Sequence, residues 1–222
     1  MTFDRIPARM NNSNDATVFL VDDDASVRSS ITRLLQASGF RVRAFASASE
    51  YLSNSDPGCH GCLLLDLRMP EIDGLELQDR LAEADSARPI LFLTGHGGVP
   101  ESVAAMKAGA ADFLEKPADP DSLVAAVHAA VALDAEKRRE AAQIRSSRKQ
   151  LETLTPRERQ VFERVVVGRL NKQIARELGV SEKTVKVHRG RVMEKMEADS
   201  LAELARLAER LGIGHGPGRG PG

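Results

Sequence analysis

Five short apolar runs alternate with segments of helical spacing in the first part of the chain. The runs are 17–21, 42–45, 62–65, 90–93 and 112–114. The segments between them repeat apolar residues every three or four positions, mostly without internal Pro or Gly, at 25–38, 47–54, 73–84, 99–108 and 120–133. This alternation, with nearly continuous apolar strands, predicts a parallel sheet covered by helices on both faces.

Polar residues follow these predicted strands where ligands of open parallel sheets bind. The first strand ends in Asp22-Asp23-Asp24, the third in Asp66, the fourth in Thr94, and the fifth runs into Lys116. In the strand order 2-1-3-4-5, the first and third strands are neighbours, so their carboxylates crowd together. Crowded carboxylates need a cation, and oxygen ligands suit Mg²⁺.

Such a cluster makes chemical sense around a phosphoryl group. The metal and Lys116 would offset the charge on its oxygens, Thr94 would donate a hydrogen bond, and Asp66 would attack phosphorus. Taken singly, each residue has an ordinary explanation, because Asp commonly ends strands in turns and Lys is commonly solvated. Their occurrence together on four strands favours the site.

The stretches VDDD, LLLDLRMPEIDG, FLTGHG and AMKAGAADFLEKP resemble the receiver domain of bacterial response regulators, over about 16–133. The resemblance implies a flavodoxin-like fold and phosphorylation of Asp66 by a sensor histidine kinase. It also implies Mg²⁺ bound by Asp22, Asp23, Asp66 and the backbone carbonyl of Arg68, switch residues Thr94, Lys116 and Phe113, and a cis Lys116–Pro117 peptide. Relatives often carry Phe where this chain has Ala118, so the resemblance does not predict how the surface around the fifth strand packs.

The chain changes character after residue 133. Residues 16–133 carry 9 Lys and Arg against 17 Asp and Glu, a net −8, whereas residues 155–213 carry 13 against 9, a net +4. An acidic half joined to a basic half predicts two kinds of partner. Residues 134–153 are charged and free of Pro and Gly, which predicts a helical linker that could continue the preceding helix.

Four shorter helical patterns follow the linker. The first begins with Thr155, Pro156 and Glu158, a capping box with Pro in the first turn. NKQIARELG ends at the helix-stop residue Gly179, and SEKTVKVHRGRVMEKM starts at Ser181, which fits a helix-turn-helix. A basic helix is often only a solvated face, but the short turn, the cap and a supporting helix on each side favour DNA binding.

Residues 154–213 resemble the four-helix output domain of the LuxR/FixJ type, through LTPRERQV and the helix-turn-helix sequence. By this resemblance Lys186 and Val187 reach base edges in the major groove, while Asn171, Lys172, Thr184 and His188 hold phosphates; Lys183 and Arg191 complete the expected DNA-binding set. Gly190 stands where some relatives carry a larger contacting side chain, so part of the specificity is left to DNA shape.

The last helical pattern is the family's dimer-forming element. Its stripe comprises Leu201, Leu204, Leu207 and Leu211. A stripe of this width serves the domain core as well as a dimer seam, so we expect its residues to divide between the two.

Other features of the chain exclude alternatives. Cys59 and Cys62 lack a second pair for a zinc site and precede a strand, unlike a redox pair that opens a helix, so we interpret them as loop and strand-start cysteines. No apolar stretch reaches the length of a membrane helix, and the N-terminus lacks the apolar core of a signal peptide, which predicts a cytoplasmic protein without a membrane partner. Residues 1–15 and 214–222 are expected to be disordered.

The sequence therefore predicts a two-component regulator of the FixJ/NarL type and not an enzyme. Phosphorylation of Asp66 is expected to favour a homodimer that binds double-stranded promoter DNA and, with RNA polymerase, activates transcription. One alternative is a phosphatase with an aspartyl nucleophile, but such enzymes typically need a second Asp where this chain has Arg68. Another alternative is a regulator that dimerises and binds DNA without phosphorylation.

Overall fold

The computed structural model describes residues 16–56, 58–84, 86, 88–95 and 99–214. These residues divide into two compact units, and the boundary along the chain lies between Arg138 and Arg139. The predictions of disorder concern 1–15 and 214–222, and of these residues all but Gly214 lie outside the described part of the chain. Within the described part of the chain, no helix has the length and apolar character to cross a membrane.

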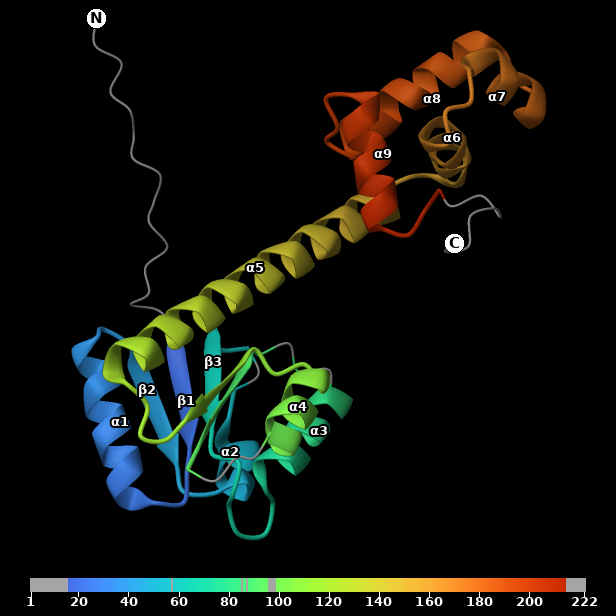
Figure 1. Cartoon of the computed structure of the whole chain (residues 1–222). Helices are drawn as coiled ribbons and strands as arrows, with labels where there is room; N and C mark the ends of the chain where they lie inside the picture. The colour runs from blue at the N-terminus through green and yellow to red at the C-terminus, as the bar shows by residue number, and fades with distance from the viewer. Residues whose placement is uncertain (1–15, 57, 85, 87, 96–98, 215–222) are drawn as a thin grey trace, which may run out of the picture. The chain divides into compact units, whose positions relative to one another are not determined.

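A five-stranded parallel sheet forms the centre of the first unit (Figure 1). Its strands are β1 (Thr17–Val21), β2 (Arg41–Phe45), β3 (Gly61–Leu65), β4 (Ile90–Thr94) and β5 (Asp112–Glu115), and their order is β2-β1-β3-β4-β5. The predicted strands, their parallel pairing and their order are all confirmed. Every residue of β1, β3 and β4 is buried, as the continuous apolar runs required.

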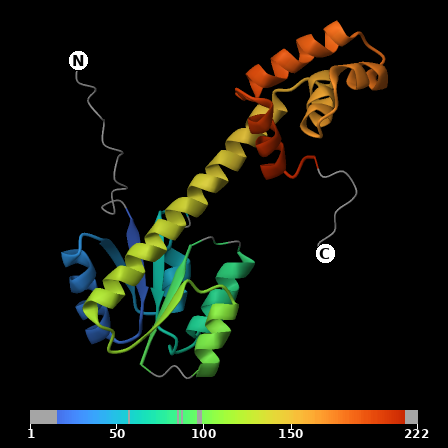
Figure 2. The same cartoon turned by 45° about the horizontal axis from the view of Figure 1, so that its top comes forward.

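Helices cover both faces of this sheet (Figure 2). They are α1 (Ala25–Ala37), α2 (Ala48–Asn54), α3 (Gly74–Glu83), α4 (Val99–Lys107) and α5 (Pro120–Glu152). Because successive strand residues face opposite sides, Phe19 and Val21 pack on the face covered by α2, α3 and α4, whereas Val18 and Leu20 pack on the face covered by α1 and α5.

Helix α5 is longer than the helix that the sequence predicts over residues 120–133. The predicted helix 120–133 continues without a break to Glu152, so the linker extends the preceding helix. Its buried apolar contacts with the sheet end at Val131. Residues 120–138 of α5 belong to the first unit and residues 139–152 to the second.

The second unit consists of the end of α5 and four helices. They are α6 (Pro156–Val166), α7 (Asn171–Leu178), α8 (Glu182–Lys195) and α9 (Leu201–Arg210). Phe162, Ile174, Val185 and Val192 are fully buried in one core that these helices share. The predicted all-α output domain is therefore confirmed.

The two cysteines occupy the predicted places and are free thiols. Cys62 lies in the buried strand β3, and Cys59 precedes that strand. Burial raises the pKa of the Cys62 thiol to about 12, so this thiol stays protonated and inert at neutral pH.

Candidate functional site: an acidic cluster and a helix-turn-helix

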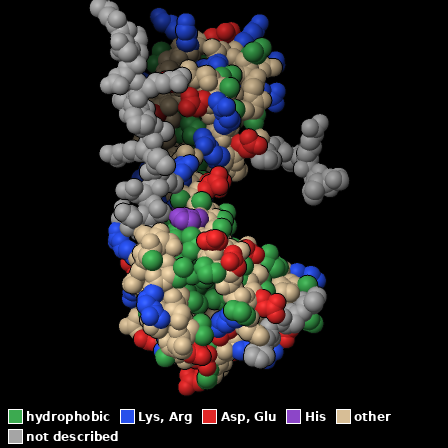
Figure 3. All heavy atoms as spheres, turned by 60° about the vertical axis from the view of Figure 1, so that its left-hand side comes forward, with side chains coloured by type: hydrophobic (Ala, Val, Ile, Leu, Met, Phe, Trp, Pro, Cys, Tyr) green, Lys and Arg blue, Asp and Glu red, His purple; other side chains and the backbone are tan. Residues whose placement is uncertain are grey.

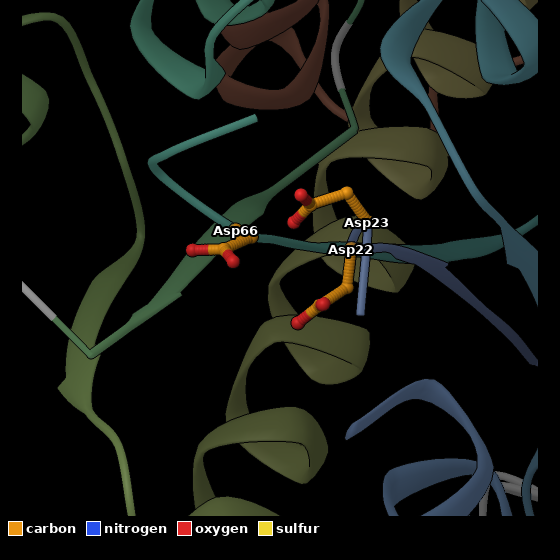
Figure 4. A group of neighbouring side chains, drawn as sticks. All are labelled: Asp22, Asp23 and Asp66. Atoms are coloured by element: carbon orange, nitrogen blue, oxygen red, sulfur yellow. The ribbon is translucent and has the colours of Figure 1, made fainter. Parts of the chain in front are cut away.

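Three carboxylates from two neighbouring strands meet at the carboxyl edge of the sheet. Asp22 and Asp23 follow β1, and Asp66 follows β3 (Figure 4). One oxygen from each lies within 4.8 Å of the others. Asp22 and Asp66 are buried and Asp23 is exposed, so the cluster is held by the fold and open to solvent on one side. The predicted convergence of these carboxylates is confirmed.

Lys116 enters this cluster from the end of β5. Its Nζ donates to Asp22 Oδ2 at 2.6 Å and to Asp66 Oδ2 at 2.8 Å. The Lys116–Pro117 peptide is cis, as expected. One amine therefore bridges two carboxylates that would otherwise repel each other.

The same contacts shift the ionisation of the buried groups. Burial raises the pKa of Asp22 above its ordinary value, although the hydrogen bonds from Lys116 and from the Asp24 amide lower it in part. Burial by itself would lower the pKa of Lys116, but its hydrogen bonds to Asp22 and Asp66 outweigh burial, so the pKa of the amine is raised. Lys116 is therefore fully charged at neutral pH.

The predicted switch residues lie on the two strands beside the cluster. Thr94 is 1% exposed at the end of β4, and its carbonyl accepts a hydrogen bond from the Lys116 amide at 2.7 Å. Phe113, on β5, is half-buried, and its ring centre lies 6.1 Å from that of Phe92. Thr94 ends β4 at the edge where the phosphoryl site was predicted, whereas Phe113 is the second residue of β5 and pairs with Phe92.

Arg68 lies on the loop after Asp66. Its amide approaches Asp66 Oδ1 at 3.4 Å, and its guanidinium forms an exposed ion pair with Glu101 of α4 at 3.0 Å. The expected role of its carbonyl as a metal ligand stays a prediction. Its side chain connects the acidic loop to the first turn of α4.

Two supporting residues, Arg28 and Gly74, and the capping role of Asp24 were not predicted from the sequence. Arg28 of α1 donates to the carbonyl of Asp22 at 2.6 Å and so holds the acidic loop from outside. Asp24 caps α1 by accepting from the amides of residues 26 and 27. Gly74 packs so closely on Asp66 that a Cβ there would lie 2.5 Å from the Asp66 carbonyl oxygen. The only sequence signal for Gly74 was its place after Asp73, the residue expected to start α3.

In the second unit, α7 and α8 form the predicted helix-turn-helix. Gly179 ends α7 in the left-handed conformation with φ 64°, and the Ser181 hydroxyl accepts from the Thr184 amide to cap α8. The half-buried Arg189 donates to Asn171 Oδ1 at 3.1 Å. This bond ties the first turn of α7 to α8 and was not predicted.

Most of the residues expected to contact DNA are exposed to solvent. Lys183, Lys186, Val187 and Arg191 of α8 and Lys172 of α7 are exposed, whereas Asn171, Thr184 and His188 are half-buried. Val187 keeps 49% of its surface exposed among cationic side chains. The environment of Gly190 is open, with no atom within 4 Å of a Cβ placed there.

A buried carboxylate joins the start of α6 to the end of α8. Glu158 of α6 is 2% exposed, accepts from the Thr155 amide at 2.9 Å, and pairs with Lys195 of α8 at 2.7 Å. The predicted capping box is confirmed. The hydrogen bond from Lys195, followed by that from Thr155, lowers the pKa of Glu158 to about 2.

The leucine stripe of α9 contributes to the core of its own unit, and its expected role in a dimer stays a prediction. Leu204 and Leu207 are buried in the core of the unit, Leu211 packs partly against it, and Leu201 is 41% exposed. Two of the four residues expected in the dimer helix are thus occupied inside their own domain. Leu201 is the member of this set that offers the most apolar surface to a partner.

Comparisons with known proteins identify a family for each of the two units. Residues 18–128 match the model of the response regulator receiver domain, and residues 152–208 match that of the bacterial regulatory proteins of the luxR family. Nodulation protein W of Bradyrhizobium diazoefficiens (strain JCM 10833 / USDA 110) is 50% identical over 90% of this chain and 88% of its own length. Transcriptional regulatory protein FixJ of the same organism is 46% identical over 88% of this chain and 96% of its own.

A solved structure extends this likeness to three dimensions. The low-resolution structure of the response regulator StyR has a TM-score of 0.79 and 45% identity, covering 88% of this chain and 99% of that one. The phosphatase alternative is not supported, because both domains match families of regulators. The chain belongs to the FixJ/NarL-type response regulators of two-component systems, DNA-binding transcription regulators rather than enzymes.

Proposed function

We propose that this regulator is a transcriptional activator switched by phosphorylation of Asp66, which a sensor histidine kinase carries out in the cytoplasm. The bridging of Asp22 and Asp66 by the Lys116 amine is the observation that supports this proposal most strongly. In this arrangement the Lys116 amine lies within hydrogen-bonding reach of Asp66, the proposed nucleophile, and of Asp22. Few structural roles require two buried acids and a lysine at a sheet edge.

The donor set of the cluster fits Mg²⁺. Asp22, Asp23 and Asp66 supply only carboxylate oxygens, the ligands that this hard cation prefers, and we assign the Arg68 carbonyl as a further ligand. When bound, Mg²⁺ supplies positive charge for the oxygens of the incoming phosphoryl group. No nitrogen or sulfur ligand is required.

The reaction then follows from the positions of the side chains. An oxygen of Asp66 attacks phosphorus, and the P–N bond of the kinase phosphohistidine breaks as the P–O bond forms. Lys116 turns from the carboxylates to the new phosphoryl oxygens, and Thr94 donates its hydroxyl to another of them. Thr94 ends β4 and Lys116 follows β5, and both strands end at this edge of the sheet.

Surface features beside the site suit a protein phosphodonor. A groove of about 390 Å³ opens next to Lys116 between α1 and the start of α5; Ala118, Ile31 and Leu123 are among its lining residues. Figure 3 brings the α1 side of the receiver unit forward and shows hydrophobic side chains gathered on it. We assign this groove as the place where the kinase approaches Asp66.

The output follows from dimer formation. Movement of Thr94 and Lys116 toward the phosphoryl group would alter the neighbouring face of α4, where Val103 and Met106 are 44% and 46% exposed. A receiver dimer through this face brings two output domains together, with Leu201 of α9 adding contact, and raises their affinity for two DNA half-sites.

We further propose that α8 is the recognition helix. Val187 and Lys186 then meet base edges, while Lys172, Lys183, Arg191, Asn171, Thr184 and His188 hold phosphates. The exposure of Val187 among cations supports base contact, because an apolar side chain there matches a thymine methyl group. Activation of transcription, through RNA polymerase, is the commoner outcome in the family.

Phosphorylation of a single carboxylate tests the chemistry. Acetyl phosphate with Mg²⁺ should add one phosphoryl group to the wild-type chain and none to Asp66→Asn, as measured by intact mass. Asp24→Asn is the matched control, since it removes a charge from the same edge but keeps the cap of α1. A phosphoryl group that survives in Asp66→Asn would move the acceptor to another residue.

A further inference from the structure

A third buried carboxylate of the receiver unit lies at the other end of β3 from Asp66. Asp134 of α5 is 0% exposed, and its Oδ2 accepts three hydrogen bonds. The donors are His60 Nδ1 at 2.5 Å, the Gly61 amide at 2.9 Å and Arg138 Nε at 2.8 Å. Asp134 therefore connects α5 to Gly61 at the start of β3, although the two residues are 73 positions apart in the chain.

Arg138 holds the same connection by its remaining nitrogens. It donates to the carbonyl of Gly58 at 2.9 Å and to that of Cys59 at 2.9 Å. The Cys59 carbonyl also accepts from Arg88 at 3.2 Å, and Arg88 in turn donates to the Asp56 carbonyl at 2.6 Å. Arg138 of α5 and Arg88, which precedes β4, thus both donate hydrogen bonds to the backbone just before β3.

The backbone at Gly61 is adapted to this contact. Gly61 has φ 147°, and a Cβ there would lie 1.8 Å from the carbonyl oxygen of Thr17. Only glycine can therefore present its amide to Asp134 at this position. Because an uncompensated buried carboxylate is strongly unfavourable, the three donors have to stay in place for the fold to keep Asp134 inside.

These contacts begin where the apolar packing of α5 ends. Val131 is the last buried apolar residue that α5 contributes to the receiver core, and Leu133 is already 38% exposed. Asp134 and Arg138 continue the attachment by polar contacts, and the compact receiver unit ends directly after Arg138. The sequence predicts Asp134 as the first residue of the linker, whereas in the structure it belongs to the receiver unit.

We propose that Asp134, Arg138 and His60 form a linker anchor, which extends the rigid receiver body to Arg138 and passes changes in the receiver to the rest of α5. Without the anchor, α5 would detach from the receiver after Val131. A conformational change in the sheet would then not be transmitted to the later residues of α5. The transmitting part of this role rests on the proposed phosphorylation switch. The attachment itself does not.

Hydrogen exchange on the full-length chain tests the attachment. Arg138→Ala should raise amide exchange in residues 132–142 by at least about 10-fold, because local opening no longer breaks these bonds. Arg139→Ala is the matched control, since it removes an exposed arginine from the next position of the same helix. Asp134→Asn, which keeps the size of the side chain, should act like Arg138→Ala; equal exchange in the Arg138 and Arg139 variants overturns the anchor.

DNA binding with and without beryllofluoride, a phosphoryl mimic, tests the transmission. The mimic should tighten DNA binding by the wild-type chain and by Arg139→Ala, and this gain should fall at least about 5-fold in Arg138→Ala. An undiminished gain in Arg138→Ala overturns the transmitting role even if exchange rises. Absence of any gain in the wild-type chain overturns the phosphorylation switch instead, while the exchange data still decide the anchor.

Discussion

The two units treat charge in opposite ways. The receiver unit gathers three carboxylates and one amine at a single edge of its sheet, with Asp22 and Asp66 buried. The output unit spreads its cations over the exposed sides of α7 and α8, and its buried carboxylate Glu158 is part of the internal structure. Concentrated charge suits chemistry on one phosphoryl group, whereas distributed charge suits a long polyanion.

Because of this difference, substitutions in the receiver cluster and in the output unit should have different effects. A change at the receiver cluster acts on groups that are coupled to one another, so it should alter stability, metal response and phosphorylation together. A change in the output unit should affect either the core or the DNA surface. Because the chain has one tyrosine and no tryptophan, fluorescence of Tyr51 reports on the receiver unit alone.

Loss of Lys116 is expected to have the largest effect. Lys116→Met leaves Asp22 and Asp66 without their shared partner and should lower the free energy of unfolding of the receiver by about 3–5 kcal/mol. Mg²⁺ should restore more stability to this variant than it adds to the wild type. Urea unfolding followed by Tyr51 fluorescence measures both effects.

Lys107→Met provides the control, because Lys107 is exposed on α4. Equal losses in the two lysine variants would contradict the concentrated arrangement of charge in the receiver.

A core substitution in α9 should act on the output unit only. Leu204→Ala removes a fully buried side chain and should lower the free energy of unfolding of that unit by about 2–4 kcal/mol, with the Tyr51 transition unchanged. Leu201→Ala should stay within about 0.5 kcal/mol, since Leu201 is exposed. Circular dichroism measures the first loss, and sedimentation of the beryllofluoride-treated chain should show a weaker dimer for Leu201→Ala alone.

Removal of the Glu158 partner should have a smaller, pH-dependent effect. The pKa of Glu158 lies at about 2, below its ordinary value of 4.5, so its contribution to stability is complete above about pH 4.5 and is lost as the pH falls toward 2. Lys195→Ala should lower the free energy of unfolding by about 1–3 kcal/mol at pH 7 and flatten this dependence. An unchanged acid limb in the circular dichroism of Lys195→Ala would show that Lys195 does not stabilise the charged form.

The sequence predicted the convergence of Asp22 and Asp66 because the topology of the sheet brings them together. Once β1 and β3 are neighbours in a parallel sheet, residues at their carboxyl ends must converge, so Asp22 and Asp66 needed only the strand order. Contacts made by long side chains across the fold carried no such signal. Arg28 on the Asp22 carbonyl, Arg189 on Asn171, and Arg138 on the chain before β3 depend on rotamers and loop paths that spacing does not specify.

The end of the receiver unit was harder to predict for a related reason. Apolar periodicity in α5 stops near Leu133, and from that point the attachment is made by a buried acid and an arginine in a segment that reads as a charged linker. Composition describes the average environment of such a segment and misses the few residues that are buried. Asp134 and Arg138 could be recognised only in the folded chain.

DNA affinity as a function of phosphorylation tests the account most directly. The DNA should be a sequence selected from a random pool by the beryllofluoride-treated chain, and binding should be measured with and without acetyl phosphate and Mg²⁺. We predict that phosphorylation tightens binding of the wild type by about 100-fold, the lower end of the gain from linking two binding modules, and leaves Asp66→Asn unchanged. Equal affinity of the phosphorylated and unphosphorylated wild-type chain would contradict a phosphorylation switch and favour a regulator that binds DNA constitutively.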